Sequence, residues 1–129
     1  MKLLLRLAEL LENEGYGSLG NDIFINNVPF EIVEAVMVRP PMSGFRIDQE
    51  LPGYFKSTFC VVLRSAGDLG LLEDKALEIS DSLTMYERDL GTEFHINYMR
   101  PLQLPYSYPI TKGELVECKV DFEFSVVIK

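Results

Sequence analysis

His95 is the only histidine in this chain of 129 residues, which makes it the first side chain to consider for catalysis. A catalytic histidine needs a nucleophile or an acid held beside it. Alternation along the strand-like run 94–100 places His95 on the opposite side from Phe94, Ile96 and Tyr98. No residue near it in the sequence supplies such a partner. We therefore interpret His95 as a histidine on the surface of a strand.

Metal and phosphate chemistry lack the residues that they require. Cys60 and Cys118 are far apart in the sequence, and with one histidine they cannot form a typical zinc site without several carboxylates. Each lies in a strand-like run, where a free cysteine in a reducing compartment behaves as a small apolar residue. Residues 15–20 (GYGSLG) match the phosphate-binding pattern GxGxxG, but they follow a helix and no helix begins after them. We expect no metal and no cofactor.

Two pairs of carboxylates are close enough in the sequence to suggest acid–base catalysis. They are Glu31 with Glu34 and Glu73 with Asp74. Acidic side chains near helix N-termini are favoured by the helix dipole, and acids on strands are common as solvated charges. We interpret both pairs as surface charge, and we expect the protein not to be an enzyme.

The composition is that of one folded domain, which we expect to span residues 1–129. Hydrophobic residues make up 47% and charged residues 25%, and the formal net charge is −8. A chain this acidic repels a phosphate backbone, so we expect no specific nucleic-acid binding, although DNA could slide past such a surface without sticking. Arg6 and Glu9 interrupt the apolar start, and no run reaches about 18 apolar residues, which argues against a signal peptide and a membrane span.

Two segments, 2–13 and 68–87, have the periodicity of amphipathic helices. Leucines at three- and four-residue spacing form one stripe in the first segment, which Gly15 ends. Ser65 or Asp68 can cap the second segment, since their side-chain oxygens accept hydrogen bonds from free backbone amides. Its predicted buried stripe consists of Leu69, Leu72, Ala76, Ile79, Leu83 and Tyr86.

Alternating apolar residues predict the strands 23–25, 30–38, 55–64, 94–100 and 115–128. The last of these would extend about 45 Å at roughly 3.3 Å per residue, so it either bends or continues past its own sheet toward a neighbour. The order of elements, α-β-β-β-α-β-β, favours an α+β fold in which successive strands form hairpins. We expect a mainly antiparallel sheet of four to five strands, with the two amphipathic helices packed on one face. The other face is polar or contacts a partner.

Two proline-rich connections, 40–54 and 101–113, begin where an Arg-Pro pair ends a strand. Long loops in compact domains are usually functional, and exposed aromatic residues and arginines are typical of interfaces. These side chains either contact another protein or fold back onto their own domain, and the sequence leaves both alternatives open. The candidate interface residues are Arg39, Pro40, Pro41, Met42, Phe45, Arg46, Tyr54, Arg100, Pro101, Tyr106 and Tyr108.

Five segments spread along the chain carry a resemblance to a known family, and they are LLLRLAELLENEG, STFCVVLR, LGLLEDKALEISDSLTMYE, YMRPLQLP and ECKVDFEFSVVIK. Their order resembles that of the tail-terminator, minor capsid or tail-completion proteins of long-tailed bacteriophages. The resemblance extends over nearly the whole chain. The connection 40–54 is unusually long by comparison.

The resemblance implies a subunit of the virion tail or neck that assembles in the host cytoplasm. It implies a hexameric ring that caps the tail tube, ends its growth and joins it to the head connector. The implied partners are further copies of the chain, the tail tube protein and the head-connector protein, with sheets lining an acidic lumen through which DNA passes. The family has no fixed catalytic set. One alternative hypothesis is another head–tail connector, a stopper or an adaptor protein. A further alternative is a small enzyme.

Overall fold

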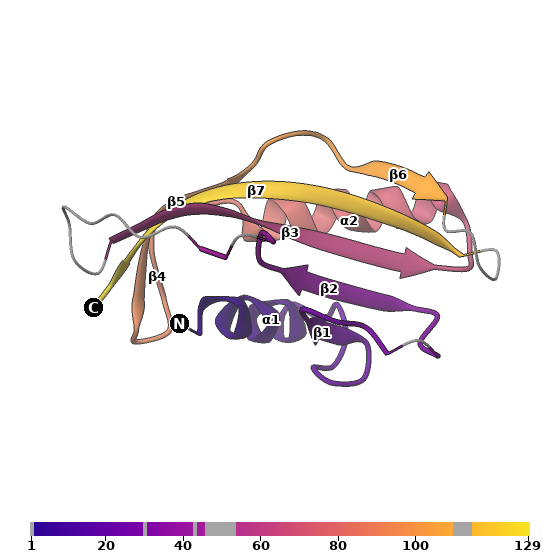
Figure 1. The fold of residues 1–129 in the computed structure, drawn as a ribbon, viewed down its shortest axis with the longest axis horizontal. Coiled ribbons are helices and arrows are strands. Elements are labelled where there is room, and N and C mark those ends of the chain that lie inside the picture. The colour runs from indigo at the N-terminus through magenta and orange to yellow at the C-terminus, as the bar shows by residue number, and fades with distance from the viewer. Residues whose placement is uncertain (1, 30, 43, 46–53, 110–114) are drawn as a thin grey trace.

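The computed structural model describes residues 2–29, 31–42, 44–45, 54–109 and 115–129 (Figure 1). In chain order their elements are α1 (Leu3–Asn13), β1 (Ile23–Ile25), β2 (Ala35–Arg39), β3 (Tyr54–Ser65), α2 (Leu69–Leu83), β4 (Met85–Leu90), β5 (Phe94–Pro101), β6 (Tyr106–Pro109) and β7 (Val116–Ile128). The α+β class, the two helices and the mostly antiparallel sheet are confirmed. The expected order and the expected four to five strands are wrong, because the described residues form seven strands.

Strand β7 lies at the centre of the sheet, whose order is β1-β2-β3-β7-β5-β4, with β6 also paired to β7. β3 runs antiparallel to β7 along its length, from Tyr54↔Val127 to Ser65↔Val116. β5 and β6 pair in succession with the other edge of β7. Both edges of the long strand are therefore covered by its own chain. β7 curves within the sheet instead of continuing toward a neighbour (Figure 1).

Strands β1 and β2 pair in parallel, which is an exception to the predicted hairpins. Asn26 follows β1 with a left-handed φ of 70°, a conformation that asparagine adopts more readily than most residues. The chain then uses residues 26–34 to return to the start of β2. The predicted strand 30–38 therefore begins only at Ala35, and its first residue, Phe30, lies outside the described residues.

Helix α2 is shorter than the predicted segment 68–87, because the chain becomes extended at Thr84 and continues as β4. Its predicted cap is found at Asp68, whose side chain accepts a hydrogen bond from a backbone amide at 2.7 Å. Tyr86, which the helical spacing assigned to the buried stripe, is 58% exposed and pairs with Tyr98 in β5. Only the two end residues of β4 are buried, so no alternation marks this strand in the sequence.

The predicted loop 101–113 contains strand β6. Its residues pair antiparallel with β7, beginning with Tyr106↔Lys119. Pro105 precedes the strand and Pro109 ends it. Proline is tolerated at the ends and free edges of sheets, because no partner strand needs its missing amide there. The four residues after Pro105, of which the last is Pro109, thus form a strand where the sequence pattern predicts a loop.

Both helices pack on one face of the sheet, as predicted, and enclose a hydrophobic core. The stripe of α1 is confirmed, since Leu3, Leu7 and Leu11 are fully buried. Between the strands, the rings of Phe59 and Phe122 stack with centroids 5.0 Å apart. No helix among the described residues is long and apolar enough to cross a membrane. The opposite face of the sheet is not covered by either described helix, and we therefore expect a functional surface on that face and at the strand ends around it.

Candidate interaction surface

The sheet face opposite the helices carries charged side chains that form ladders across the strands. The salt bridges on it are Arg64–Glu117 at 3.1 Å, Arg100–Glu123, and Lys119–Asp121 at 3.5 Å. Arg39 of β2 and Lys56 of β3 emerge on the same face, and neither forms a salt bridge with any described residue. Among the described residues of β2, β3, β7 and the C-terminal end of β5, this face therefore has five basic and three acidic side chains, in contrast to the acidic chain as a whole.

A hollow of about 330 Å³ lies between the ends of β2 and β5, where the sequence has its two Arg-Pro pairs. Arg39, Pro40, Pro41 and Met42 line one side, and Leu102, which follows β5, lines the other. The Met42 side chain is fully exposed, and that of Leu102 is 51% exposed. The two loop entries, which are similar in sequence, are thus brought together at one site.

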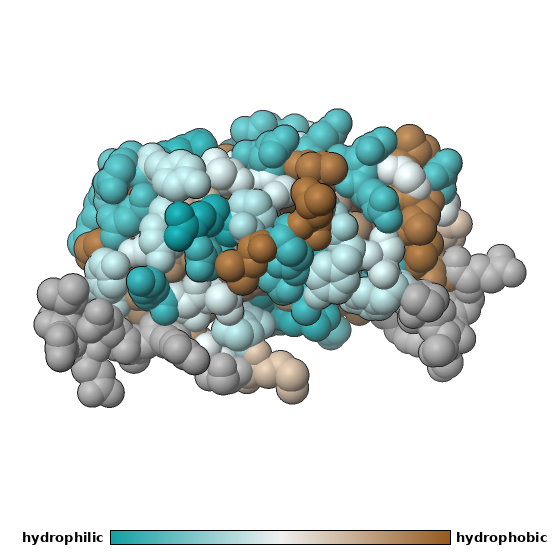
Figure 2. Space-filling model, turned by 90° about the horizontal axis from the view of Figure 1, so that it is seen from above, coloured by the Kyte–Doolittle hydropathy of each residue, from teal (hydrophilic) through white to brown (hydrophobic). Residues whose placement is uncertain are grey.

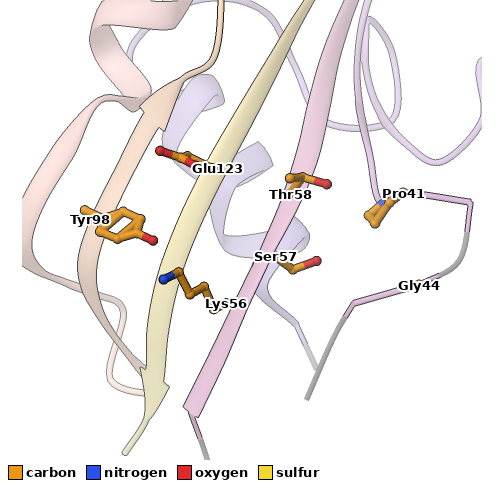
Figure 3. A pocket seen from close by; sticks show the side chains of 7 residues that line it. All are labelled: Pro41, Gly44, Lys56, Ser57, Thr58, Tyr98 and Glu123. Atoms are coloured by element: carbon orange, nitrogen blue, oxygen red, sulfur yellow. The ribbon is translucent and has the colours of Figure 1, made fainter. Parts of the chain in front are cut away.

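A second hollow of about 380 Å³ adjoins the first, because Pro41 and Thr58 line both of them. Around it, Lys56 and Thr58 come from β3, Glu123 from β7 and Tyr98 from β5 (Figure 3). The exposed ammonium group of Lys56 gives this hollow its unpaired charge. We call the two hollows together the β3 groove.

Exposed apolar side chains continue beyond the β3 groove along the connection between β5 and β6. Leu104 is 76% exposed and Tyr106 is 40% exposed. Seen from above, apolar side chains form separate small groups on a mainly hydrophilic surface (Figure 2). Small groups of apolar side chains surrounded by polar residues are typical of contacts between proteins.

Two candidate aromatic residues fold back onto their own chain. The ring of Phe45 packs edge-on against Phe124, with centroids 5.6 Å apart, and joins the hydrophobic core. Tyr54 is the first residue of β3, and its hydroxyl accepts a hydrogen bond from Ser125 at 2.8 Å. Arg46 lies outside the described residues. Phe45 and Tyr54 therefore hold the ends of the long connection against the sheet.

The other candidates lie in or beside β5 and β6. Pro101 is the last residue of β5, and the Arg100 guanidinium lies 4.6 Å from the centre of the Tyr98 ring. Tyr106 and Tyr108 have ring centroids 6.4 Å apart. Burial and the neighbouring Glu117 carboxylate raise the pKa of Tyr108 well above its usual value, so its hydroxyl stays protonated.

A β-bulge at Asn97 shifts the register of β5 against β7 and changes which side chains share a face. Tyr98 consequently lies on the same face as His95, although strict alternation placed them on opposite faces. Met99 points into the core and is fully buried. The predicted sides after residue 96 are therefore wrong.

His95 is held between two carboxylates of the neighbouring strand β4. Its Nδ1 lies 2.9 Å from Asp89, and its Nε2 lies 2.9 Å from Glu87. Hydrogen bonds to these two carboxylates raise the pKa of His95. Both ring nitrogens are thus engaged, and neither is free to activate a nucleophile. This arrangement was not predicted, because strand β4, which supplies both carboxylates, was not predicted.

One member of each carboxylate pair takes part in local structure. Glu34 and Glu73 each accept a hydrogen bond from a serine side chain, at 2.8 and 2.9 Å. Across the described ranges, no group of three or more histidine, cysteine, aspartate or glutamate residues is arranged to hold a metal ion. By these hydrogen bonds, Glu34 and Glu73 stabilise the contacts between neighbouring segments.

The cysteines and the glycine-rich segment also have structural surroundings. Cys60 and Cys118 are free and buried in different clusters, and burial raises the pKa of both thiols. In residues 15–20, the amides of Ser18 and Leu19 already donate to carboxylates, so they are not free to bind a phosphate.

Comparison with known proteins gives a family and a fold. A family profile described as bacteriophage tail terminator protein matches residues 10–128. Among solved structures, a chain in the virion of a native gene transfer agent particle is similar, with a TM-score of 0.60 and 15% identity, over 94% of this chain and 84% of that chain. Another solved chain gives a TM-score of 0.48 at 14% identity, over 100% of this chain and 96% of that chain, which is too weak to carry an argument. No curated protein matches in sequence.

Proposed function

The chain belongs to the bacteriophage tail terminator family and is a structural protein of the virion tail or neck. On this premise we propose that six copies of the chain form a ring that ends the tail tube. The match over residues 10–128 carries the proposal, because it includes both sides of the β3 groove and nearly all of the sheet. The fold shared with a chain of a gene transfer agent virion is consistent with it.

A closed ring requires a contact between two different surfaces of the same chain. In a heterologous contact of this kind, each copy offers one surface to the copy before it and the other surface to the copy after it. The β3 groove and the apolar side chains beside it supply a first such surface. Exposed Met42, Leu102 and Leu104 would be its apolar anchors.

The ring would bind the last layer of tail tube protein on one side and the head-connector protein on the other. By occupying the tube end, it would prevent further tube subunits from adding. We propose that the whole chain, 1–129, acts as one domain in this role, without a cofactor and without catalysis. The net charge of −8 would let DNA pass through the opening without being held there.

Light scattering after size-exclusion chromatography, together with electron microscopy, tests the proposal on the full chain. We expect rings of six copies, formed by the chain alone or on addition of the tail tube protein, and tubes capped at one end. A chain that stays monomeric at every concentration and leaves tube growth unchanged would contradict the proposal. Binding to the head connector without binding to tube ends would instead indicate a connector or stopper.

A further inference from the structure

The solvent-facing side of α2 is acidic and apolar at the same time. Residues 68–84 contain five acidic residues and one lysine. Asp74, Glu78 and Asp81 are exposed, and none of them forms a salt bridge with a described residue. On the same helix, Leu71 is 70% exposed and Leu77 is 42% exposed.

The position of Asp81 is electrostatically unfavourable in a subunit that has no partner. The C-terminal end of a helix carries partial negative charge, so cations are favourable there and anions are unfavourable. Asp81 lies in the last turn of α2, and that turn contains no basic residue. A cation brought by another molecule would relieve this repulsion.

The β3 groove is complementary to this side of α2 in both charge and apolarity. Arg39 and Lys56 are its two cations without a salt bridge among the described residues. Met42 and Leu102 expose apolar side chains at its rim. An acidic helix with two exposed leucines thus matches a groove that offers two apolar contacts and two cations without a salt bridge in the described part of the chain.

The spacing of the charges is compatible with direct pairing. Asp74 and Asp81 are separated by about 10 Å along the helix, at roughly 1.5 Å per residue. Lys56 lies four residues from Cys60, which pairs with Arg39, so the two cations are about 14 Å apart at roughly 3.3 Å per residue and one strand spacing. Long arginine and lysine side chains can cover a difference of this size.

We propose that α2 of one copy docks into the β3 groove of the next copy, with Asp74 and Asp81 facing Lys56 and Arg39. This inference rests on the proposed ring, since it assigns the two unlike surfaces that a ring needs. The contact is heterologous, because the helix surface and the groove are different parts of the chain. Each added copy would make the same contact with the copy before it until the ring closes.

Charge reversal and its compensation provide the main test. In the full chain, Asp74→Lys with Asp81→Lys, or Arg39→Glu with Lys56→Glu, should raise the concentration needed for half-assembly by tenfold or more, about the effect expected of like charges brought together. The two altered chains mixed together should form rings in which they alternate, because the reversed helix faces the reversed groove and the natural helix faces the natural groove. The chain that carries all four changes should also form rings again. Matched single reversals at exposed residues outside both surfaces, Glu31→Lys and Arg88→Glu, should leave assembly unchanged.

Cross-linking tests the geometry independently of the charges. Leu71→Cys and Met42→Cys are made in separate chains, which are mixed and treated with a short bifunctional thiol reagent. We expect dimers of one chain of each kind, and none from either variant alone, because the native cysteines are buried. Variants are compared by circular dichroism to verify that they fold.

The possible outcomes separate this contact from the ring itself. If the natural chain forms rings but the reversals leave them unchanged, or if no mixed dimers form, the docking of α2 is overturned and the ring remains. If the reversals abolish only binding to tail tube protein, α2 binds the tube instead, which also overturns the proposal. Failure of the natural chain to form any ring contradicts the proposed function.

Discussion

The core under β3 and β7 and the hairpin formed by β4 and β5 belong to one sheet, but different forces hold them. In the core, Phe59 and Phe122 are stacked and almost completely buried. In the hairpin, β5 buries Phe94 and Ile96 in the same core, but four consecutive residues of β4 are exposed, and ion pairs in water link the side chains on its outer face and at its tip. Apolar burial depends little on salt or pH, whereas exposed ion pairs depend on both.

Besides the pairing of β5 with β7, polar side-chain contacts join the hairpin to the rest of the molecule at its tip and at its base. At its tip, the Arg6 guanidinium of α1 forms a salt bridge with Glu93. At its base, the bulge at Asn97 donates a hydrogen bond to the buried Ser125 hydroxyl at 3.0 Å, which in turn donates to Tyr54. We therefore expect the hairpin to open locally under conditions that leave the core folded.

The largest effect is expected from Phe122→Ala. This substitution removes a fully buried ring and leaves a cavity beside Phe59, and it should lower the free energy of unfolding by about 3–5 kcal/mol. Tyr86→Ala in the hairpin is the matched control, because that ring is 58% exposed and its loss should cost less than about 0.5 kcal/mol. Chemical denaturation measures both values. Equal losses would show that the two regions are not held differently.

A smaller effect is expected at the junction of the two regions, from Ser125→Ala. The Ser125 side chain is 1% exposed, and its loss leaves Asn97 and Tyr54 without a buried partner. Unsatisfied groups of this kind typically cost about 1–3 kcal/mol. Denaturation should report the loss, and amide exchange should accelerate more in the hairpin than in the core. Thr92→Ala at the exposed hairpin tip is the control, and an equal effect there would contradict the role of the junction.

The elements that the sequence predicted well are those with one buried and one exposed side. Segment 115–128 alternates along its length and forms β7, and the leucines of 2–13 form α1. Strand β4 was missed because its middle residues are all exposed, and β6 because prolines surround it. Both strands form because they pair with strands elsewhere in the sheet, and the periodicity within one segment contains no information about such pairing.

The candidate surface was predicted only in part, for the same reason. The two Arg-Pro pairs drew attention to 39–42 and 100–101, but only the register of the sheet brings Met42 and Leu102 to one groove. In the sequence, Lys56 is one outward residue of an alternating strand, and the interpretation of Glu73 and Asp74 as surface charge indicates no partner for either. Their significance depends on the ion pairs that neighbours do or do not supply, which no single segment reveals.

The tip of the hairpin should respond to Arg6→Gln. Exposed salt bridges contribute little to overall stability, so the denaturation midpoint should remain within error. Amide exchange in residues 90–94 should nevertheless accelerate, because the contact with Glu93 is lost. High salt should accelerate exchange in the natural protein and have less effect in the variant. Unchanged exchange would show that backbone pairing alone holds the tip.

The smallest effect is expected from the ionisation of His95. Hydrogen bonds to Glu87 and Asp89 raise the pKa of His95 above 6.5, and those from Lys129 and His95 lower the pKa of Asp89 below 3.8. The contribution of His95 is therefore fully present below pH 6.5 and is lost as the pH rises through its raised pKa. The contribution of Asp89 is present above pH 3.8 and is lost as the pH falls through its lowered pKa.

Protection of the hairpin amides, relative to those of the core, should consequently be greatest between these two pH values. Nuclear magnetic resonance titration should find the pKa of His95 above 6.5 and a lower value in Glu87→Gln. In His95→Gln, the fall in hairpin protection at higher pH should disappear, while the core amides should be unaffected. A pKa of His95 at or below 6.5 would show that the two carboxylates do not hold the ring in solution. Backbone hydrogen bonds between β4 and β5 would then hold the hairpin without a contribution from the ion pairs of His95. The hairpin would differ from the core only in its exposure to solvent.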